Sequence, residues 1–409
     1  MKMIKKFVSA SLFTACFFSA SLYLYAQDAN TLDDASKAEG DMISASMKGH
    51  IFKPALVDAT DERVKTLKVP AGFIVTKFAE NLGKPRMIAV SDKGLVYVTN
   101  RDEGTVTLLR DTDKDGKADE NKLVAKRDKM HGITIHNNKM YLITVEDVFT
   151  TDIKNDGTLG DLKMIMQGLP DGGQHANRTI AIGPDNMLYV SIGSTCNACE
   201  ETREESATMV QAKLDGTDKK IFAKGLRNTI GFDWHPQTKE LFGMDHGIDW
   251  LGDESQKEEL NKIEKDENYG WPYVFEKGKP NLADTPPQGQ TFEEYAKKTK
   301  FAELTYKAHS APMSMKFYTG TQFPAGYKNS AFVAMHGSWN RAEPSGYNVV
   351  RLKFENGKPT GFEDFLSGFL VDGNKSQFGR VVGIAQHTDG SLLVTDDNNG
   401  VVYRVAYKK

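Results

Sequence analysis

The sequence predicts an all-β fold: a six-bladed β-propeller with a long loop and helical insertion on one rim. Three observations predict it. A short polar stretch, an apolar strand, a turn and a second strand follow one another six times along the chain. The copies begin near residues 86, 131, 177, 227, 311 and 380, so the first three intervals are each about 45 to 50 residues. A period of this length, with several short strands per unit, is typical of four-stranded propeller blades.

The clearest copy spans Leu169 to Ser194 and shows how one unit is built. Its polar part contains His175 and Arg178 and leads into the apolar strand Thr179–Ile182. A Gly-Pro-Asp-Asn turn then precedes a second strand, Met187–Ile192. Because the two strands are antiparallel, the residues before the first and after the second share one end of the hairpin. Repeated around a ring, these open ends would converge on a single site.

The chain divides into three predicted parts. Residues 1–26 predict a secretory signal peptide, because the basic stretch MKMIKK precedes an apolar run. An uncleaved membrane anchor and lipid attachment at Cys16 are the alternatives; all three export the protein, and we expect a periplasmic location. Residues 27–64 are polar and predict a linker or a loosely attached helical arm, and residues 65–409 are expected to form the propeller.

The net charge of the chain excludes one class of partner. The whole chain carries a formal net charge of −3, and loss of the three lysines at positions 2, 5 and 6 with the signal peptide leaves −6. This acidic balance argues against nucleic acid as a partner.

The stretch LKVPAGFIVTKFAEN from Leu67 alternates as an outer strand does. We expect it to complete the last blade beside VVYRVAY from Val401, which would remove exposed sheet edges.

The insertion is expected between Ile248 and His309. A loop of this length inside a compact domain is usually functional or disordered. Its aromatic residues predict a wall or lid over the open ends of the ring; the alternative is that they only pack the insertion onto the ring. These residues are Trp250, Tyr269, Trp271 and Tyr273.

Histidine and arginine gather at the predicted open ends. The histidines there are His131, His175, His246, His309 and His336. The arginines, with one asparagine, are Arg86, Arg101, Arg178, Arg227, Asn228, Arg341 and Arg380. A cationic funnel in an otherwise acidic protein predicts an anionic ligand held by arginine forks, with a neutral histidine available as a base.

The loop from Asp111 to Asp119 predicts a structural calcium site or, as the alternative, a solvated acidic turn. Asp111, Asp113 and Asp115 stand at alternate positions before Gly116, as in the first half of a calcium loop. Lys122 occupies the twelfth position, where such loops carry a bidentate glutamate.

Cys196 and Cys199 form a CxxC motif directly after the second strand of the clearest copy. Glu200 follows instead of histidine, which excludes covalent haem attachment, and a single pair is too small for a four-ligand zinc site. In an exported protein we expect a disulfide, with a redox-active dithiol as the alternative.

The chain from about Leu67 to Tyr407 carries a series of motifs: GLPDGGQHANRTIAIGPDNMLYVSIG, GLRNTIGFDWHP, ELFGMDHG, NYGWP, HSAPMSMKFYTG, HGSWNR and GRVVGIAQHTDGSLLVTDD. In order and spacing they resemble the soluble glucose/sorbosone (aldose sugar) dehydrogenase family. The resemblance implies a six-bladed propeller that oxidises aldoses with pyrroloquinoline quinone (PQQ) and calcium.

The resemblance also implies roles for particular residues. His175 matches the catalytic base of the family, which takes the proton of the anomeric hydroxyl while hydride passes from the sugar to the quinone. Arg227 matches the residue that polarises the quinone carbonyl. Asn228 and Arg380 match residues that bind the cofactor, Arg380 through a carboxylate.

Calcium in the family is held by two consecutive backbone carbonyls, which match those of Gly247 and Ile248. The sequence departs from the family pattern at several positions. Gln174 stands where the family has an acidic neighbour of the base, which puts the tuning of that base in question. Other side chains are expected to replace family residues that bind the cofactor: His131, and His336 or Arg341.

We therefore expect a PQQ- and calcium-dependent dehydrogenase that converts aldoses or related sugar aldehydes to lactones or acids. A separate acceptor, such as a cytochrome c or a quinone, would receive the electrons, because the sequence has no haem motif. The alternatives are a calcium-dependent lactonase and a non-catalytic sugar-binding propeller. The Arg227–Asn228 pair and His175 favour the dehydrogenase.

Overall fold

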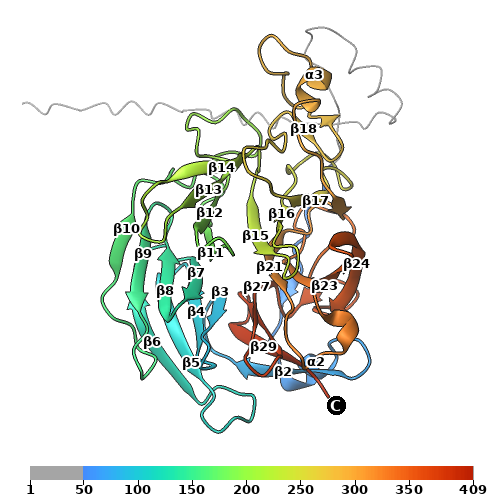
Figure 1. Cartoon of the computed structure of the whole chain (residues 1–409). Helices are drawn as coiled ribbons and strands as arrows, with labels where there is room; N and C mark the ends of the chain where they lie inside the picture. Colours follow the sequence, from blue (N-terminus) through green and yellow to red (C-terminus); the bar gives the residue numbers. More distant parts are fainter. Residues whose placement is uncertain (1–48, 409) are drawn as a thin grey trace, which may run out of the picture.

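Six four-stranded sheets form the body of the protein (Figure 1). The computed structural model describes residues 49–408, so the predicted signal peptide and most of the predicted linker lie outside the described residues. Within the described range only two short α-helices occur, and the all-β prediction is confirmed.

Each sheet is antiparallel, and in all but the sixth the strands follow one another in chain order. The first contains β3 (Pro85–Val90), β4 (Val96–Asn100), β5 (Thr105–Arg110) and β6 (Glu120–Lys126), and the second contains β7 (Gly132–His136), β8 (Lys139–Ile143), β9 (Val148–Asp152) and β10 (Lys163–Met166). The third contains β11 (Thr179–Ile182), β12 (Leu188–Ile192), β13 (Thr208–Ala212) and β14 (Lys220–Lys224), and the fourth contains β15 (Thr229–Trp234), β16 (Leu241–Asp245), β17 (Glu258–Lys262) and β20 (Leu304–Tyr306). The fifth contains β21 (Pro312–Phe317), β22 (Ala331–Met335), β23 (Asn348–Glu355) and β24 (Lys358–Leu366), and the sixth contains β27 (Val381–Gln386), β28 (Leu392–Asp396), β29 (Val401–Tyr407) and β2 (Phe73–Ala79).

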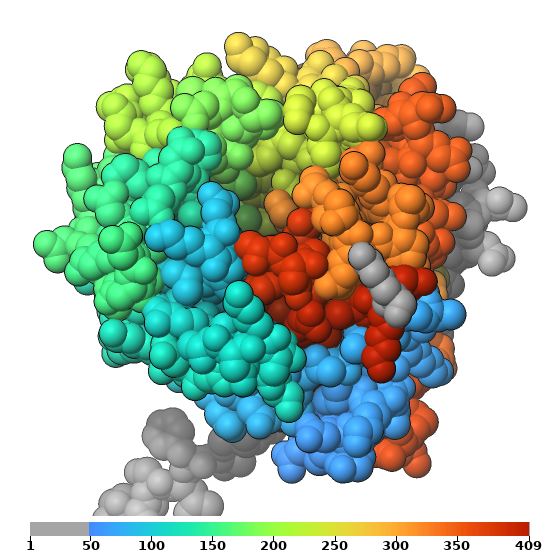
Figure 2. Space-filling view, turned by 60° about the horizontal axis from the view of Figure 1, so that its bottom comes forward, coloured from blue at the N-terminus to red at the C-terminus, as the bar shows by residue number. Residues whose placement is uncertain are grey.

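The sheets are arranged in a closed ring. Strands β3, β7, β11, β15, β21 and β27 contact one another in that order, and β27 contacts β3. Figure 2 shows the sheets around a central depression, and a cavity of 210 Å³ on the axis is lined by residues of all six of these strands. Glycine allows the inner strands to approach closely: a Cβ on Gly231 would lie 2.6 Å from the backbone of Ser314, and one on Gly383 would lie 2.5 Å from the carbonyl oxygen of Arg86.

The sixth sheet joins the two ends of the ring-forming chain, because it combines β2 with the last three strands. Strand β2 pairs antiparallel with β29, with Phe73 opposite Tyr407. The predicted pairing of the Leu67 stretch with the Val401 stretch is therefore confirmed. The ring of Phe73 packs between neighbouring sheets, with its centroid 4.7 Å from that of Phe323 and 5.0 Å from that of Phe365. Such aromatic packing belongs to the cores that lie between adjacent sheets.

Ordered structure begins before residue 65, within the segment expected to be a linker or a loosely attached helical arm. Strand β1 (Ala55–Leu56) pairs in parallel with β26 (Ser376–Gln377), which also pairs with β25 (Leu370–Val371). Helix α2 (Asp61–Lys65) is capped by Thr60, whose hydroxyl accepts the N–H of Arg63. Val64 is buried in the core. This small contact surface left too weak an apolar pattern to be recognised in the sequence.

The predicted insertion is shorter than residues 248–309, because β17 and β20 lie inside that range and belong to the fourth sheet. Strand β17 reads Glu-Glu-Leu-Asn-Lys and lacks the apolar alternation of a strand, although its first four residues are buried. The segment between β17 and β20, residues 263–303, carries β18 (Val274–Phe275), β19 (Lys279–Pro280) and helix α3 (Phe292–Ala296), and projects from the ring in Figure 1. Within residues 49–408, neither helix is long and apolar enough to cross a bilayer.

Candidate active site

The predicted site residues stand where the inner hairpins open. His175 precedes β11, and Arg227 and Asn228 directly precede β15. His336 follows β22, and Arg380 directly precedes β27. Since these strands adjoin one another around the ring, their open ends face the same end of the axis.

His175 is held in one tautomer by Ser194. Its Nδ1 lies 2.9 Å from the carbonyl oxygen and 2.8 Å from the hydroxyl oxygen of Ser194. The hydroxyl itself donates to the carbonyl of Cys196 at 2.8 Å, so it presents only lone pairs to the imidazole. Nδ1 therefore carries the proton, and Nε2 is left as an unprotonated base. Burial, and then the charge of Arg227, lowers the pKa of His175 to about 3, which keeps the ring neutral.

Arg227 is nearly fully buried and is fixed by three acceptors. Its Nε donates to the carbonyl of Asn197 at 2.9 Å, one terminal nitrogen donates to Asn197 Oδ1 at 2.8 Å, and the other donates to the carbonyl of His246 at 3.4 Å. Asp249 lies 3.6 Å from the same guanidinium. Asn228 is buried beside it. The buried carboxylate of Asp245 accepts the backbone N–H groups of both residues, at 2.9 and 2.8 Å.

His131 is fully buried, and one of its nitrogens is free. Nδ1 donates to the carbonyl of Arg178 at 2.8 Å, which leaves a lone pair on Nε2. Among residues 49–408, that Nε2 and the Nε of Arg101 are buried without a hydrogen-bond partner. Arg178 has another function: it donates to the carbonyls of Pro170 and His175 at 3.1 and 2.7 Å and so supports the loop that carries the base.

His336 belongs to a buried charge network. Its Nε2 donates to one oxygen of Asp397 at 3.0 Å, and Arg86 donates to the other oxygen. Burial alone would raise the pKa of Asp397, but His336 and Arg86 lower it below its usual range. Arg380 donates through Nε to the carbonyl of His336 at 3.1 Å and also bonds Gly337. Its remaining terminal nitrogen has no partner among the described residues and is available to an anion.

Arg341 is engaged by the protein instead. Its Nε donates to the carbonyl of Glu343 at 2.8 Å, and one terminal nitrogen bonds Glu254 at 2.6 Å. The other terminal nitrogen donates to the carbonyls of Asp253 and Ala308. His336 and Arg341 are the two alternatives expected to replace one cofactor-binding residue of the family. His336 stands at the shared open end, whereas Arg341 joins loops to one another.

Gly247 and Ile248 form a pair of fixed peptides. The N–H of Gly247 donates to buried Glu258 at 3.0 Å, and the N–H of Ile248 donates to Gln256 at 2.7 Å. Glu258 also accepts the N–H of Ala311 at 2.8 Å, and burial raises the pKa of Glu258 to about 8. No residue in the described range donates to the carbonyl oxygens of Gly247 and Ile248. Two free carbonyls from consecutive residues suit a hard cation such as calcium.

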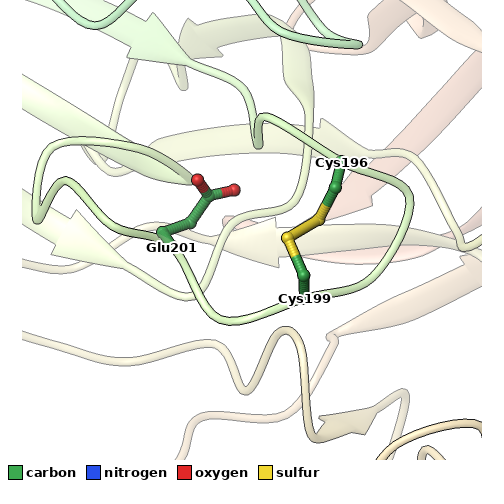
Figure 3. A group of neighbouring side chains, drawn as sticks. All are labelled: Cys196, Cys199 and Glu201. Carbon is green, nitrogen blue, oxygen red and sulfur yellow. A yellow bond between two sulfur atoms is a disulfide. The ribbon is translucent and has the colours of Figure 1, made fainter.

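Cys196 and Cys199 are joined by a disulfide. Figure 3 shows this bond in the loop that also carries Glu201. Because the sulfur atoms are bonded to each other, the cluster of Cys196, Cys199 and Glu201 is not a thiolate metal site. Glu201 instead accepts the N–H and hydroxyl of Thr195, both at 2.7 Å.

The acidic turn from Asp111 gathers its carboxylates as predicted for a calcium loop. One oxygen from each of Asp111, Asp113 and Asp115 lies within 4.8 Å of the others. The same carboxylates also accept backbone N–H groups of the turn, for example that of Gly116 at 3.0 Å. This pattern is shared by solvated Asx turns, and calcium binding there stays a prediction.

The aromatic residues of the predicted insertion, Ile248 to His309, divide into two groups. Tyr269 and Trp271 are buried and pack residues 263–303 onto the ring, as the alternative prediction has it, whereas Tyr273 packs within that segment against Val274 and Ala296. Trp250 is 46% exposed, and its ring lies edge-on to that of Trp339, which is 42% exposed, with centroids 4.8 Å apart. Trp250 and Trp339 are therefore an exposed aromatic pair that could form part of an open wall.

Sequence analysis missed the carboxylates that support the site. Asp245 ends β16, and Asp396 and Asp397 stand at the corresponding end of β28. Asp396 accepts the N–H of Arg380 at 2.9 Å, as Asp245 accepts that of Arg227. An acidic residue at the last position of the second strand was the signal that could have found them.

The fold and the site define a β-propeller-like protein with a cationic end that carries a neutral histidine base. Comparisons with known proteins identify the family to which the chain belongs. The chain belongs to the TrAA12-like family, whose model matches residues 67–408, and the predicted family resemblance is confirmed.

Three similar proteins illustrate the relationship. An uncharacterized protein of Borreliella burgdorferi is 35% identical over 86% of this chain and 93% of its own. A pyrroloquinoline quinone-dependent pyranose dehydrogenase of Coprinopsis cinerea is 24% identical over 82% of this chain, which spans only 54% of that relative. The calcium structure of the Trichoderma reesei carbohydrate-active enzyme of family AA12 superimposes with a TM-score of 0.73 at 21% identity, over 84% of this chain and 97% of that chain.

Proposed function

We propose that the protein is a PQQ- and calcium-dependent dehydrogenase that oxidises aldoses or related sugar aldehydes to lactones or acids. The single observation that carries this proposal is the arrangement of His175. Its Nδ1 proton is committed to Ser194, its ring is neutral, and Nε2 is left as a base within the electrostatic influence of Arg227. The family relationship and the named activity of the Coprinopsis cinerea relative support the same reaction.

The residues fit an anionic quinone. PQQ bears several carboxylates, and Arg380 has a terminal nitrogen free to donate to one of them. Arg101 Nε and His131 Nε2 are buried without protein partners, and a polar ligand would satisfy them as donor and acceptor. Arg227 would lie against a carbonyl that gains negative charge, with Asn228 beside it.

The carbonyls of Gly247 and Ile248 would hold the calcium ion. When bound together, PQQ and calcium supply an electrophilic quinone that accepts hydride from the sugar carbon. His175 Nε2 would take the proton of the hydroxyl on that carbon. Ser194 would stabilise the imidazolium through its carbonyl and hydroxyl oxygens, both of which accept from Nδ1.

The architecture fits the proposal. We read each four-stranded sheet as one blade of a six-bladed propeller and residues 263–303 as an insertion on its rim. The disulfide supports an exported, periplasmic protein. A sugar would be the substrate, and a separate cytochrome c or quinone would receive the electrons.

Neither alternative has comparable support. A lactonase of this kind would coordinate its metal through central side-chain carboxylates. Here Asp245 and Glu258 are engaged by backbone N–H groups, and Asp397 is engaged by Arg86 and His336. A non-catalytic sugar-binding protein would have no need of a base with an enforced tautomer.

The test is a titration of metal-stripped protein with PQQ and calcium, in which dye reduction is followed with a panel of aldoses. Activity should require both additions. His175→Ala should retain PQQ binding and lose turnover by about 10²- to 10⁴-fold, the usual contribution of a general base. His136→Ala is the matched control, because this half-buried histidine bonds Asn186 at the opposite ends of the hairpins. Wild-type turnover in His175→Ala would contradict the proposal.

A further inference from the structure

The loop between β12 and β13 contacts both residues proposed to act in the chemistry. We call residues 194–201 the cysteine loop. It begins with Ser194, the partner of His175, and contains Asn197, the partner of Arg227. The backbone N–H of Ser194 also donates to the carbonyl of Arg227 at 2.8 Å. One short loop therefore lies between the base and the proposed electrophilic arginine.

The first contact of the loop orients the base. The carbonyl of Cys196 accepts the hydroxyl proton of Ser194, which turns the oxygen lone pairs toward His175. The carbonyl of Thr195 accepts the N–H of Gln174 at 2.8 Å. Through these bonds the cysteine loop fixes both the tautomer of His175 and the backbone next to it.

The second contact positions the arginine. Asn197 Oδ1 accepts from Arg227 at 2.8 Å and from the N–H of Asp249 at 2.9 Å. Its amide nitrogen donates to the carbonyl of Asp249 at 3.0 Å, and its own carbonyl accepts from Arg227 Nε at 2.9 Å. The side chain of Asn197 thus joins Arg227 to the residue that directly follows the Gly247–Ile248 carbonyl pair.

The loop itself is closed at both ends. The Cys196–Cys199 disulfide spans Asn197, and Glu201 bonds Thr195 through the N–H and hydroxyl of that threonine. Cys196 also packs in an apolar cluster with Trp271 and Ile248. A disulfide within such a short loop limits the conformations available to Asn197 even where that side chain is partly exposed.

We propose that the disulfide-closed cysteine loop is a positioning element for the site, and that Asn197 is its principal positioning residue toward Arg227. The inference rests on the proposed function. Asn197 touches no reacting atom; its side-chain oxygen and its backbone carbonyl hold the guanidinium of Arg227 in one orientation. Oxidation of the two cysteines is thereby coupled to the affinity for the cofactor.

The experiment is a PQQ titration, by absorbance, of calcium-loaded apoprotein. Asn197→Ala should weaken PQQ binding by about 10-fold or more, because it removes an acceptor from a buried guanidinium. Asn121→Ala, on the exposed face of β6, should leave the dissociation constant unchanged. The combined Cys196→Ser and Cys199→Ser variant should show a loss similar in direction to that of Asn197→Ala.

A double-mutant cycle separates positioning from general destabilisation. In an Arg227→Lys background, which lacks the guanidinium fork, Asn197→Ala should change PQQ affinity by less than about 2-fold. An equal loss in both backgrounds would overturn the positioning role, as would wild-type affinity in Asn197→Ala. If Asn197→Ala fails to fold, wild-type affinity in the cysteine variant would overturn it instead. If the unaltered protein binds no PQQ, both this inference and the proposed function fail.

Discussion

Asp397 offers a direct test of the charge network beneath the site. Its side chain is 11% exposed and joins Arg86, 13% exposed, to His336. Asp397→Asn keeps the shape but removes the charge and turns an amide N–H group toward one of two donors. Breaking a buried ion pair by changing one partner costs about 3 to 5 kcal/mol. Because these side chains retain some exposure, we expect a loss near the lower limit, about 3 kcal/mol of unfolding free energy at pH 7.

The pH dependence of this loss has a defined sign. The pKa of Asp397 is lowered in the folded protein, so the carboxylate stabilises the fold above its ordinary pKa of 3.8. That stabilisation is lost as the pH falls through the lowered folded pKa. The difference between the wild type and Asp397→Asn should therefore be constant from about pH 5 to 8 and shrink in stronger acid.

The assay is urea unfolding of apoprotein, fitted for midpoint and slope at each pH. Asp102→Asn is the matched control, because Asp102 pairs with Lys84 at 2.8 Å with both side chains more than half exposed. Such a surface pair contributes about 0 to 1 kcal/mol. A loss below about 1 kcal/mol in Asp397→Asn, or one equal to that of the control, would refute the reasoning.

Three further predictions follow from the described contacts. Burial raises the pKa of Glu259 to about 8, so the folded state retains a proton that the unfolded state releases above about pH 4.5, and stability declines as pH rises toward 8. Between about pH 4.5 and 8, Glu259→Gln should make the decline of the unfolding free energy with pH less steep, by the equivalent of about one proton. An unchanged slope contradicts the burial argument. Trp250→Ala should raise the KM for sugar about 10-fold with little change in kcat, whereas Phe301→Ala, an equally exposed aromatic change on the insertion, should leave both unchanged. Arg341→Ala should reduce the free energy of unfolding by about 2 kcal/mol, because Arg341 bonds loop carbonyls, yet leave PQQ affinity within about 2-fold. A large loss of affinity would show that Arg341 binds the cofactor.

The repeating hairpins could be predicted because they depend on local signals. Apolar alternation predicted strands such as β11 and β12. The polar residues before the first strand of each hairpin placed His175 and Arg227 at one end of the ring. Strand β17 escaped detection because Glu258 and Glu259 occupy buried positions that ordinarily hold apolar residues. Their burial is compensated by N–H groups of Gly247, Ala311 and Glu276, which lie 11, 53 and 17 positions away and outside the strand itself.

The supporting residues of the site were hidden for the same reason. Asn197 reads as an ordinary polar residue between two cysteines, and its importance comes from Arg227 and Asp249, 30 and 52 positions further along the chain. The opposite error occurred at Arg341, where a charged side chain in a matching motif is engaged by loop carbonyls. Residue type indicated what chemistry was available, whereas the tertiary contacts decide which groups are free.

The pairing of β2 with β29 gives the ring a single seam. The partners in this pair are more than 300 positions apart, since Phe73 lies opposite Tyr407, so its closure carries a loop entropy cost that the hairpins elsewhere do not bear. During synthesis β2 is made first and stays unpaired until β29 has been made. Until then the incomplete sixth sheet exposes the edges of β2 and β28. The sixth sheet is consequently the last of the six to be completed, and the ring stays open until the final strand pairs.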